Sequence, residues 1–112
     1  MDLKKYLGKK IKIIIDRPLG SNHTKYDFVY EVNYGYVPET KAPDGEEIDA
    51  YLLGVDKAVD EYTGKCIAIV HRTNDDDDKL IIVSERANDL SNEEIIRQIN
   101  FQEKYFISEI QR

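Results

Sequence analysis

The sequence contains a single cysteine among its 112 residues and no long apolar run. Cys66 therefore has no partner for an internal disulfide, and the apolar residues 67–70 that follow it predict a small buried side chain. No stretch approaches the roughly 20 apolar residues that span a bilayer, and the chain begins without the apolar core of a signal peptide. We therefore expect a cytoplasmic protein that makes no membrane contact.

Basic residues are fewer than acidic ones: the chain has 16 lysines and arginines and 22 aspartates and glutamates, which gives a net charge of −6. This balance argues against nucleic acid as the main partner, since phosphate backbones are bound by clustered Lys and Arg. An acidic protein that binds a small phosphate compound must overcome like-charge repulsion, and a metal ion is the usual means. The length and the 41% hydrophobic content fit one folded domain over residues 1–112.

Several familiar catalytic patterns are missing as well. The two histidines, His23 and His71, have no ligand spacing to each other or to Cys66, so a zinc site is not expected. There is no glycine-rich phosphate loop of the Walker type and no Gly-x-Ser-x-Gly nucleophile motif. Any chemistry in this chain must come from other residue types.

Short segments of β-branched and aromatic residues, separated by turn residues, predict strands. The turn signal at 43–46, Pro-Asp-Gly-Glu, is the clearest, because Asp caps its own backbone and Gly accepts a positive φ. Five strands of this length suggest a small closed barrel. The predicted strands cover residues 9–16, 29–37, 48–53, 66–72 and 79–83.

A helix is expected near the C-terminus. Ser91 and Glu94 have the spacing of a capping box, in which each residue satisfies a free backbone N–H of the other. Apolar residues then recur roughly on one stripe that would pack on the barrel, namely Ile95, Ile99, Phe106 and Ile110. The predicted fold class is therefore β-rich α+β.

Four carboxylates lie within six positions at Asp44, Glu46, Glu47 and Asp49. Asp49 is unusual because the rest of its strand is apolar, and a lone buried carboxylate is costly. A hard cation such as Mg²⁺, which prefers oxygen ligands, would remove that cost. The alternative is a plain turn with solvated glutamates and with Asp49 on the barrel surface.

A second acidic run, Asp75 to Asp78, lies in the loop 73–78 and precedes Lys79. Charge runs in hairpin loops are most often simply hydrated. A functional role requires one or two of these aspartates to meet Asp44 and Asp49 at a metal ion. Lys79 could then contact a substrate oxygen.

Arg17 continues the alternation of Ile11, Ile13 and Ile15, which predicts that its side chain points toward the core. An arginine there needs an anion, either a structural carboxylate or a phosphate bound in bidentate fashion. Three tyrosines of the second predicted strand share a face, and their hydroxyls can donate to either kind of anion. They are Tyr30, Tyr34 and Tyr36.

Taken together, these segments resemble family I soluble inorganic pyrophosphatases, over most of the chain from Asp16 onward. The resemblance is carried by residues 16–17, 30–38, 44–50, 77–79 and 101–105. It implies an OB-like, five-stranded closed barrel with flanking helices. It also implies Mg²⁺-dependent hydrolysis of diphosphate to two phosphates, with Mn²⁺ as a second candidate metal, and is compatible with a homo-oligomer.

The resemblance also implies a role for individual residues. The metal ligands would be Asp44, Asp49, Asp77 and, by a looser match, Asp75. Glu46 would orient or deprotonate the attacking water. Phosphate would be contacted by Arg17, Tyr34, Lys79 and Tyr105, with Tyr30 in support.

The chain departs from the family at several positions. Glu46 replaces a shorter aspartate, and the N-terminal glutamate and lysine of the family site have no clear counterpart before Lys9. Phe106 stands where the family has a lysine, and the acidic loop is shorter. Two alternatives therefore stay open: a hydrolase of another phosphoanhydride or phosphoester, and a non-catalytic module that binds phosphate or metal.

Overall fold

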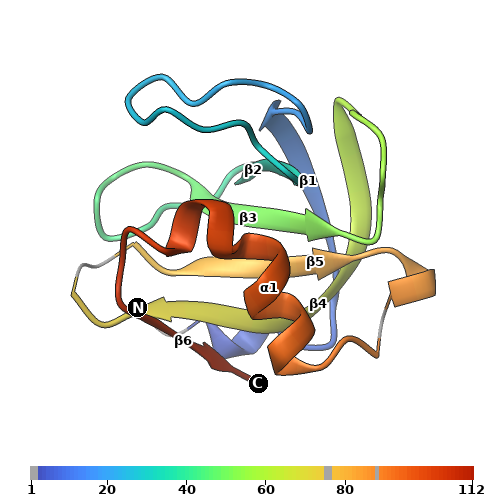
Figure 1. The fold of residues 1–112 in the computed structure, drawn as a ribbon. Helices are drawn as coiled ribbons and strands as arrows, with labels where there is room; N and C mark the ends of the chain where they lie inside the picture. The colour runs from blue at the N-terminus through green and yellow to red at the C-terminus, as the bar shows by residue number, and fades with distance from the viewer. Residues whose placement is uncertain (1–2, 75–76, 88) are drawn as a thin grey trace.

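The computed structural model describes residues 3–74, 77–87 and 89–112 (Figure 1). Six strands, one α-helix and two short 3₁₀ helices make up the described chain. They are η1 (Lys4–Tyr6), β1 (Lys10–Arg17), β2 (Asn33–Val37), β3 (Ile48–Leu53), β4 (Glu61–Arg72), β5 (Lys79–Val83), η2 (Glu85–Ala87), α1 (Asn92–Glu103) and β6 (Ser108–Gln111). Among these residues no helix has the length and apolar character needed to cross a membrane.

Strands β1 to β5 close into a barrel, which confirms the predicted fold class. The strand order is β1-β2-β3-β5-β4, and β1 pairs with β4 to complete the ring. Only β3 and β5 run parallel, so the barrel is mixed. Strand β6 adds to the free edge of β4, and α1 lies across the outer face of β3 and β5 (Figure 1).

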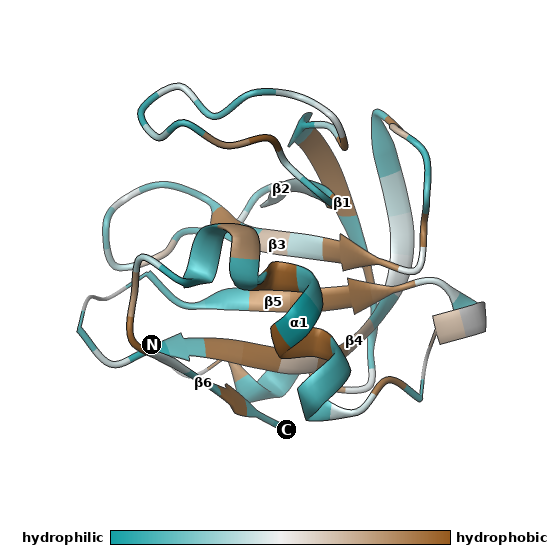
Figure 2. Ribbon diagram, viewed as in Figure 1, coloured by the Kyte–Doolittle hydropathy of each residue, from teal (hydrophilic) through white to brown (hydrophobic). Residues whose placement is uncertain are grey.

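Side-chain alternation divides the apolar residues into two cores. In β3, Ile48, Ala50 and Leu52 fill the barrel, whereas Tyr51 and Leu53 face outward beneath the helix. The outward core also holds the apolar residues of the helix, Ile95, Ile99 and Phe101. Figure 2 shows hydrophobic colour along β4 and β5 where α1 crosses them. Because Asp49 alternates with the barrel residues, it lies on the outer face.

Two β-bulges interrupt the pairing of β1 and β4, one near the end of β1 and one in the middle of β4. The pairing of β1 with β2 shifts between Ile15 and Arg17, and Arg17 is therefore paired with the outward-facing Tyr34. The prediction that Arg17 shares the core side of the preceding isoleucines is thus wrong. A matching shift in β4 between Cys66 and Ala68 leaves Cys66 inside the barrel and Ala68 outside.

The ends of three predicted elements also differ from the structure, and one of them is β4, which begins at Glu61 rather than at residue 66. The helix ends at Glu103, so the prediction of Phe106 and Ile110 on its stripe is wrong. Ile110 instead belongs to β6, where it pairs with Val70 of β4. Strand β2 begins at Asn33 rather than at residue 29, because the preceding residues pair with 20–23 instead.

Local capping and turn signals were predicted correctly. Ser91 accepts a hydrogen bond from the Glu94 backbone N–H, and the Glu94 carboxylate accepts from Ser91 N, which completes the capping box. In the turn before β3, Asp44 Oδ1 accepts from Glu46 N at 3.0 Å, and Gly45 has a φ of 88°. Cys66 is fully buried, and burial raises the pKa of its thiol to about 11.

Candidate functional site

The site lies on the outer face of the barrel where the parallel strands β3 and β5 begin. Asp49 and Lys79 are register partners there, and Asp77 lies two residues before β5. Lys79 Nζ donates to Asp49 Oδ2 at 3.0 Å and to Asp77 Oδ2 at 2.8 Å. The lysine side chain is 2% exposed, whereas the two carboxylates are 31% and 32% exposed. A buried ammonium thus holds two solvent-facing carboxylates together.

These three residues form part of a cleft of about 460 Å³. Its walls come from the barrel, from residues 23–26 of the β1–β2 connection and from the C-terminal end of α1 with the residues after it. Its charged lining residues are the cations Arg17, Lys25, Arg72 and Lys79 and the anions Asp16, Asp49 and Asp77. The cleft therefore has more cations than carboxylates, although the whole chain is acidic.

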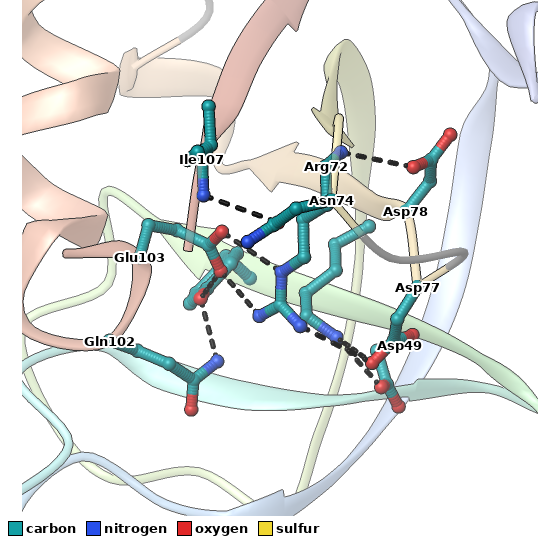
Figure 3. Close-up of polar contacts among 10 residues, drawn as sticks. Asp49, Arg72, Asn74, Asp77, Asp78, Gln102, Glu103 and Ile107 are labelled. Carbon is teal, nitrogen blue, oxygen red and sulfur yellow. Dashed lines mark hydrogen bonds and ion pairs between the residues drawn. The ribbon is translucent and has the colours of Figure 1, made fainter. Parts of the chain in front are cut away.

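Arg72 enters the cleft from the end of β4 and is held from behind by the helix (Figure 3). Its Nε and Nη2 donate to the two oxygens of Glu103, at 3.0 and 2.7 Å. Its Nη1 lies 3.5 Å from Asp77 Oδ2, and its guanidinium stacks 3.6 Å from the centre of the Phe106 ring. Burial acts to lower the pKa of Arg72, but Glu103 outweighs it and the pKa is raised.

Two polar residues complete the shell around Glu103. Tyr51 donates its hydroxyl to Glu103 Oε2 at 2.5 Å, and Gln102 Nε2 donates to Tyr51 Oη at 2.6 Å. Burial, followed by the charge of Glu103, raises the pKa of Tyr51 well above its usual value. No buried side-chain polar atom of the described residues lacks a hydrogen-bond partner. The arginine is therefore fixed in one orientation.

The structure brings Arg17, Tyr30 and Tyr34 into the same cleft as Asp49. Tyr34 lies under the lysine, with its ring centre 5.4 Å from Lys79 Nζ. Burial raises the pKa of both tyrosines, so their hydroxyls keep their protons at neutral pH. Asp77 and Lys79 line this cleft too.

Other residues singled out from the sequence lie elsewhere. Asp44 and Glu46 are exposed in the turn before β3 and do not line the cleft. Tyr105 is 43% exposed and stacks on Tyr26 at 4.7 Å rather than reaching the charged wall. Asp75 lies outside the described residues.

A divalent metal would find two suitable protein ligands here. The carboxylates of Asp49 and Asp77 flank one cationic position, now taken by Lys79 Nζ, and both reach solvent. Mg²⁺ is often bound through one or two carboxylates, with water and substrate phosphate completing its shell. The donor set fits that mode. Within the described part of the chain, no group of three or more Asp, Glu, His or Cys is placed to hold a metal ion.

Sequence reasoning missed Arg72 and the residues that hold it. The available signal was a basic residue at the end of an apolar strand, next to the acidic loop. The bulge in β4 and the pairing with Glu103 depend on contacts between residues far apart in the chain. The segment His23–Tyr26 was also missed, because its role in the cleft depends on how residues 20–30 fold back.

Glu103→Ala is expected to destabilise the protein by roughly 3–5 kcal/mol, because it leaves the buried Arg72 charge without its partner. Urea unfolding measures the change. Glu61→Ala is the matched control, since the Lys12–Glu61 pair is more than half exposed and should contribute less than about 1 kcal/mol. The double variant R72M/E103L should recover much of the loss. Equal effects of E103A and E61A would contradict this assignment.

Comparison with known proteins identifies the family of this chain. Residues 5–112 match the profile of the family described as inorganic pyrophosphatase. The curated inorganic pyrophosphatase of Saccharolobus solfataricus is 35% identical over 68 residues. That alignment covers 42% of this chain and only 39% of the relative.

Solved structures share the fold. The inorganic pyrophosphatase of Ehrlichia chaffeensis aligns with a TM-score of 0.71 and 19% identity, over 92% of this chain and 85% of that one. The enzyme from Coxiella burnetii aligns with a TM-score of 0.66 and 19% identity, over 90% and 83%. Since the family profile matches nearly the whole sequence, the chain belongs to the inorganic pyrophosphatase family.

Proposed function

We propose that this protein hydrolyses inorganic diphosphate to two phosphates with the help of Mg²⁺. The proposal depends mainly on one observation: Lys79 joins Asp49 and Asp77 in a cleft that also holds Arg17 and Arg72. Family membership supports this choice of substrate. Carboxylates for a metal and guanidinium groups for phosphate are the parts that phosphoryl transfer requires.

The cations of the cleft have a direct task in this proposal. Arg17, Arg72 and Lys79 bind phosphate oxygens and stabilise the charge that collects on the leaving phosphate. Hydrolysis adds one water to a phosphorus atom and breaks the bond from that phosphorus to the bridging oxygen. The bridging oxygen leaves with the other phosphate, and the water proton passes to a base. Tyr34 donates its hydroxyl to the bound anion.

Asp49 and Asp77 would hold the metal ion. A bound Mg²⁺ would neutralise phosphate charge and lower the pKa of a water bound to it. Lys79 keeps the two carboxylates together before substrate arrives, and its ammonium then becomes available to a phosphate oxygen. Asp44 and Asp75 remain further candidates for a second metal.

Glu46 is proposed to accept the proton of the attacking water, as the family resemblance implies. It is exposed and outside the cleft lining, so the segment 40–47 must bend toward the bound substrate for Glu46 to act. Substrate-driven closure of a loop over a site is a common way to complete a catalytic set.

A second candidate is a non-catalytic module that binds phosphate. It is favoured by the ion pairs of Lys79 with both carboxylates and by the position of Asp44 and Glu46 outside the cleft. Tight binding of diphosphate without release of phosphate, under several divalent metals, would support this candidate over hydrolysis.

Asp49→Asn should lower Mg²⁺-dependent phosphate release from diphosphate by about a hundredfold or more. The amide keeps a hydrogen-bond acceptor for Lys79 but loses the charge that a metal requires. A colorimetric phosphate assay, run with Mg²⁺ and with EDTA, measures the change. Asp56→Asn is the control, because Asp56 is an exposed carboxylate beyond the opposite end of β3. Full turnover by D49N, with an unchanged melting temperature, would disprove the proposed metal cluster.

Glu46→Gln should reduce kcat by about a hundredfold while leaving the KM for diphosphate within about twofold, since the residue acts on water rather than on substrate. Steady-state kinetics at saturating Mg²⁺ measures both constants. The neighbouring Glu47→Gln provides the control on the same exposed segment. Wild-type kcat in E46Q would remove Glu46 from the mechanism while leaving the roles of Asp49 and Asp77 intact.

A further inference from the structure

The connection between β1 and β2 is a built element rather than a loose loop. Gly20 N donates to Tyr30 O and Tyr30 N donates to Ser21 O, each at 2.8 Å. Farther along, His23 N donates to Phe28 O at 3.0 Å, and Asn22 pairs with Val29 as an isolated bridge. We call residues 20–30 the hairpin. In Figure 1 it extends away from the barrel, above the start of β3.

The tip of the hairpin forms one wall of the cleft. His23, Thr24, Lys25 and Tyr26 all line it. His23 Nδ1 accepts hydrogen bonds from Lys25 N at 2.9 Å and from Tyr26 N at 3.1 Å, so the ring orders the turn. Burial, with the charges of Arg17 and Lys25, lowers the pKa of His23. The imidazole is therefore neutral at pH 7, and its remaining proton is on Nε2.

Aromatic rings support this tip. Tyr26 stacks on Tyr105, with ring centres 4.7 Å apart and planes 16° apart, and Phe28 packs near both. The His23 ring contacts Tyr26 at 5.0 Å and Phe28 at 4.7 Å. Despite these contacts Tyr26 is 42% exposed. A large aromatic surface thus stays in solvent at the edge of a charged cleft.

The cleft therefore has two chemically different walls. The barrel wall carries Asp49, Arg72 and Lys79, which suit a phosphate–metal complex. The hairpin wall carries the rings of His23 and Tyr26 and the ammonium of Lys25. A volume of about 460 Å³ falls in the range of sites for organic ligands, and inorganic diphosphate has no group that uses an aromatic wall.

We propose that the hairpin wall binds the base of a nucleoside diphosphate whose phosphates occupy the barrel wall. This rests on the proposed function, because it names a substrate class for the same phosphoanhydride chemistry. Planar bases stack on aromatic side chains through their π faces and need little hydrogen bonding to do so. His23 Nε2–H supplies one donor to the base or ribose. Lys25 neutralises a phosphate oxygen between the two walls.

Calorimetric titration with two non-hydrolysable analogues tests the proposal: methylenediphosphonate, and adenosine 5′-(α,β-methylene)diphosphate, both with Mg²⁺. The wild-type protein should bind the adenosine analogue at least about fivefold more tightly. Tyr26→Ala should remove this preference and leave the affinity for methylenediphosphonate within about twofold. Tyr26→Phe should retain the preference, because it keeps the ring. Val29→Ala is the matched control, since Val29 is 46% exposed on the same hairpin and does not line the cleft.

Equal affinity of the wild-type protein for the two analogues would overturn the proposal. So would a Tyr26→Ala variant that loses affinity for both to the same extent, because the ring would then only support the hairpin. The proposed function fails separately. If phosphate release from diphosphate is absent but the adenosine preference is present, the nucleoside site stands and the hydrolysis does not.

Discussion

The contact on which the site depends is that of the Lys79 ammonium with Asp49 and Asp77. Lys79 and Asp49 begin two adjacent parallel strands and are direct register partners, so the barrel itself sets their separation. The two carboxylates carry like charges and repel each other at short range, so a cation between them is needed to hold them in place. The lysine is buried in the wall and the carboxylates reach solvent. The fold thereby presents the carboxylate oxygens to the cleft, and the lysine charge offsets the repulsion between them.

A second, deeper ion pair keeps the rest of the cleft in place. Arg72 and Glu103 join the end of β4 to the end of α1. Tyr51 donates a further hydrogen bond to Glu103, and Gln102 donates to Tyr51. A buried pair of this kind contributes orientation more than net stability. With Arg17, Lys25 and Lys79, Arg72 gives the lining of the cleft four cations against three carboxylates. An acidic chain can in this way hold an anionic ligand, with a metal ion adding further positive charge.

Much of the fold could be predicted because its signals are local. The bounds of β3 and β5 follow from apolar runs next to turn residues, and the start of α1 follows from its capping box. The end of α1 was not predictable, since no glycine or proline marks it. There the chain leaves the helix to hydrogen-bond with Thr73 through Ile107 and then to pair with β4. Those interactions join residues more than thirty positions apart.

The residues of the site that could be predicted are also those with local sequence signals. A carboxylate in an otherwise apolar strand, the acidic run and the family resemblance brought out Asp49, Asp77 and Lys79, which the structure places together. Alternation failed for Arg17, because a bulge inserts one residue and reverses the side on which it lies. For Arg72 the local signal was only a basic residue at the end of an apolar strand, and its position depends on a second bulge and on a carboxylate from another element.

A crystal structure grown with Mn²⁺ and methylenediphosphonate tests the central claim most directly, because anomalous scattering locates the metal without ambiguity. The account predicts a Mn²⁺ peak bound by carboxylate oxygens of Asp49 and Asp77, with Lys79 Nζ turned toward a phosphonate oxygen. A Lys79 that keeps both ion pairs while metal and phosphonate bind elsewhere, or fail to bind, would contradict it.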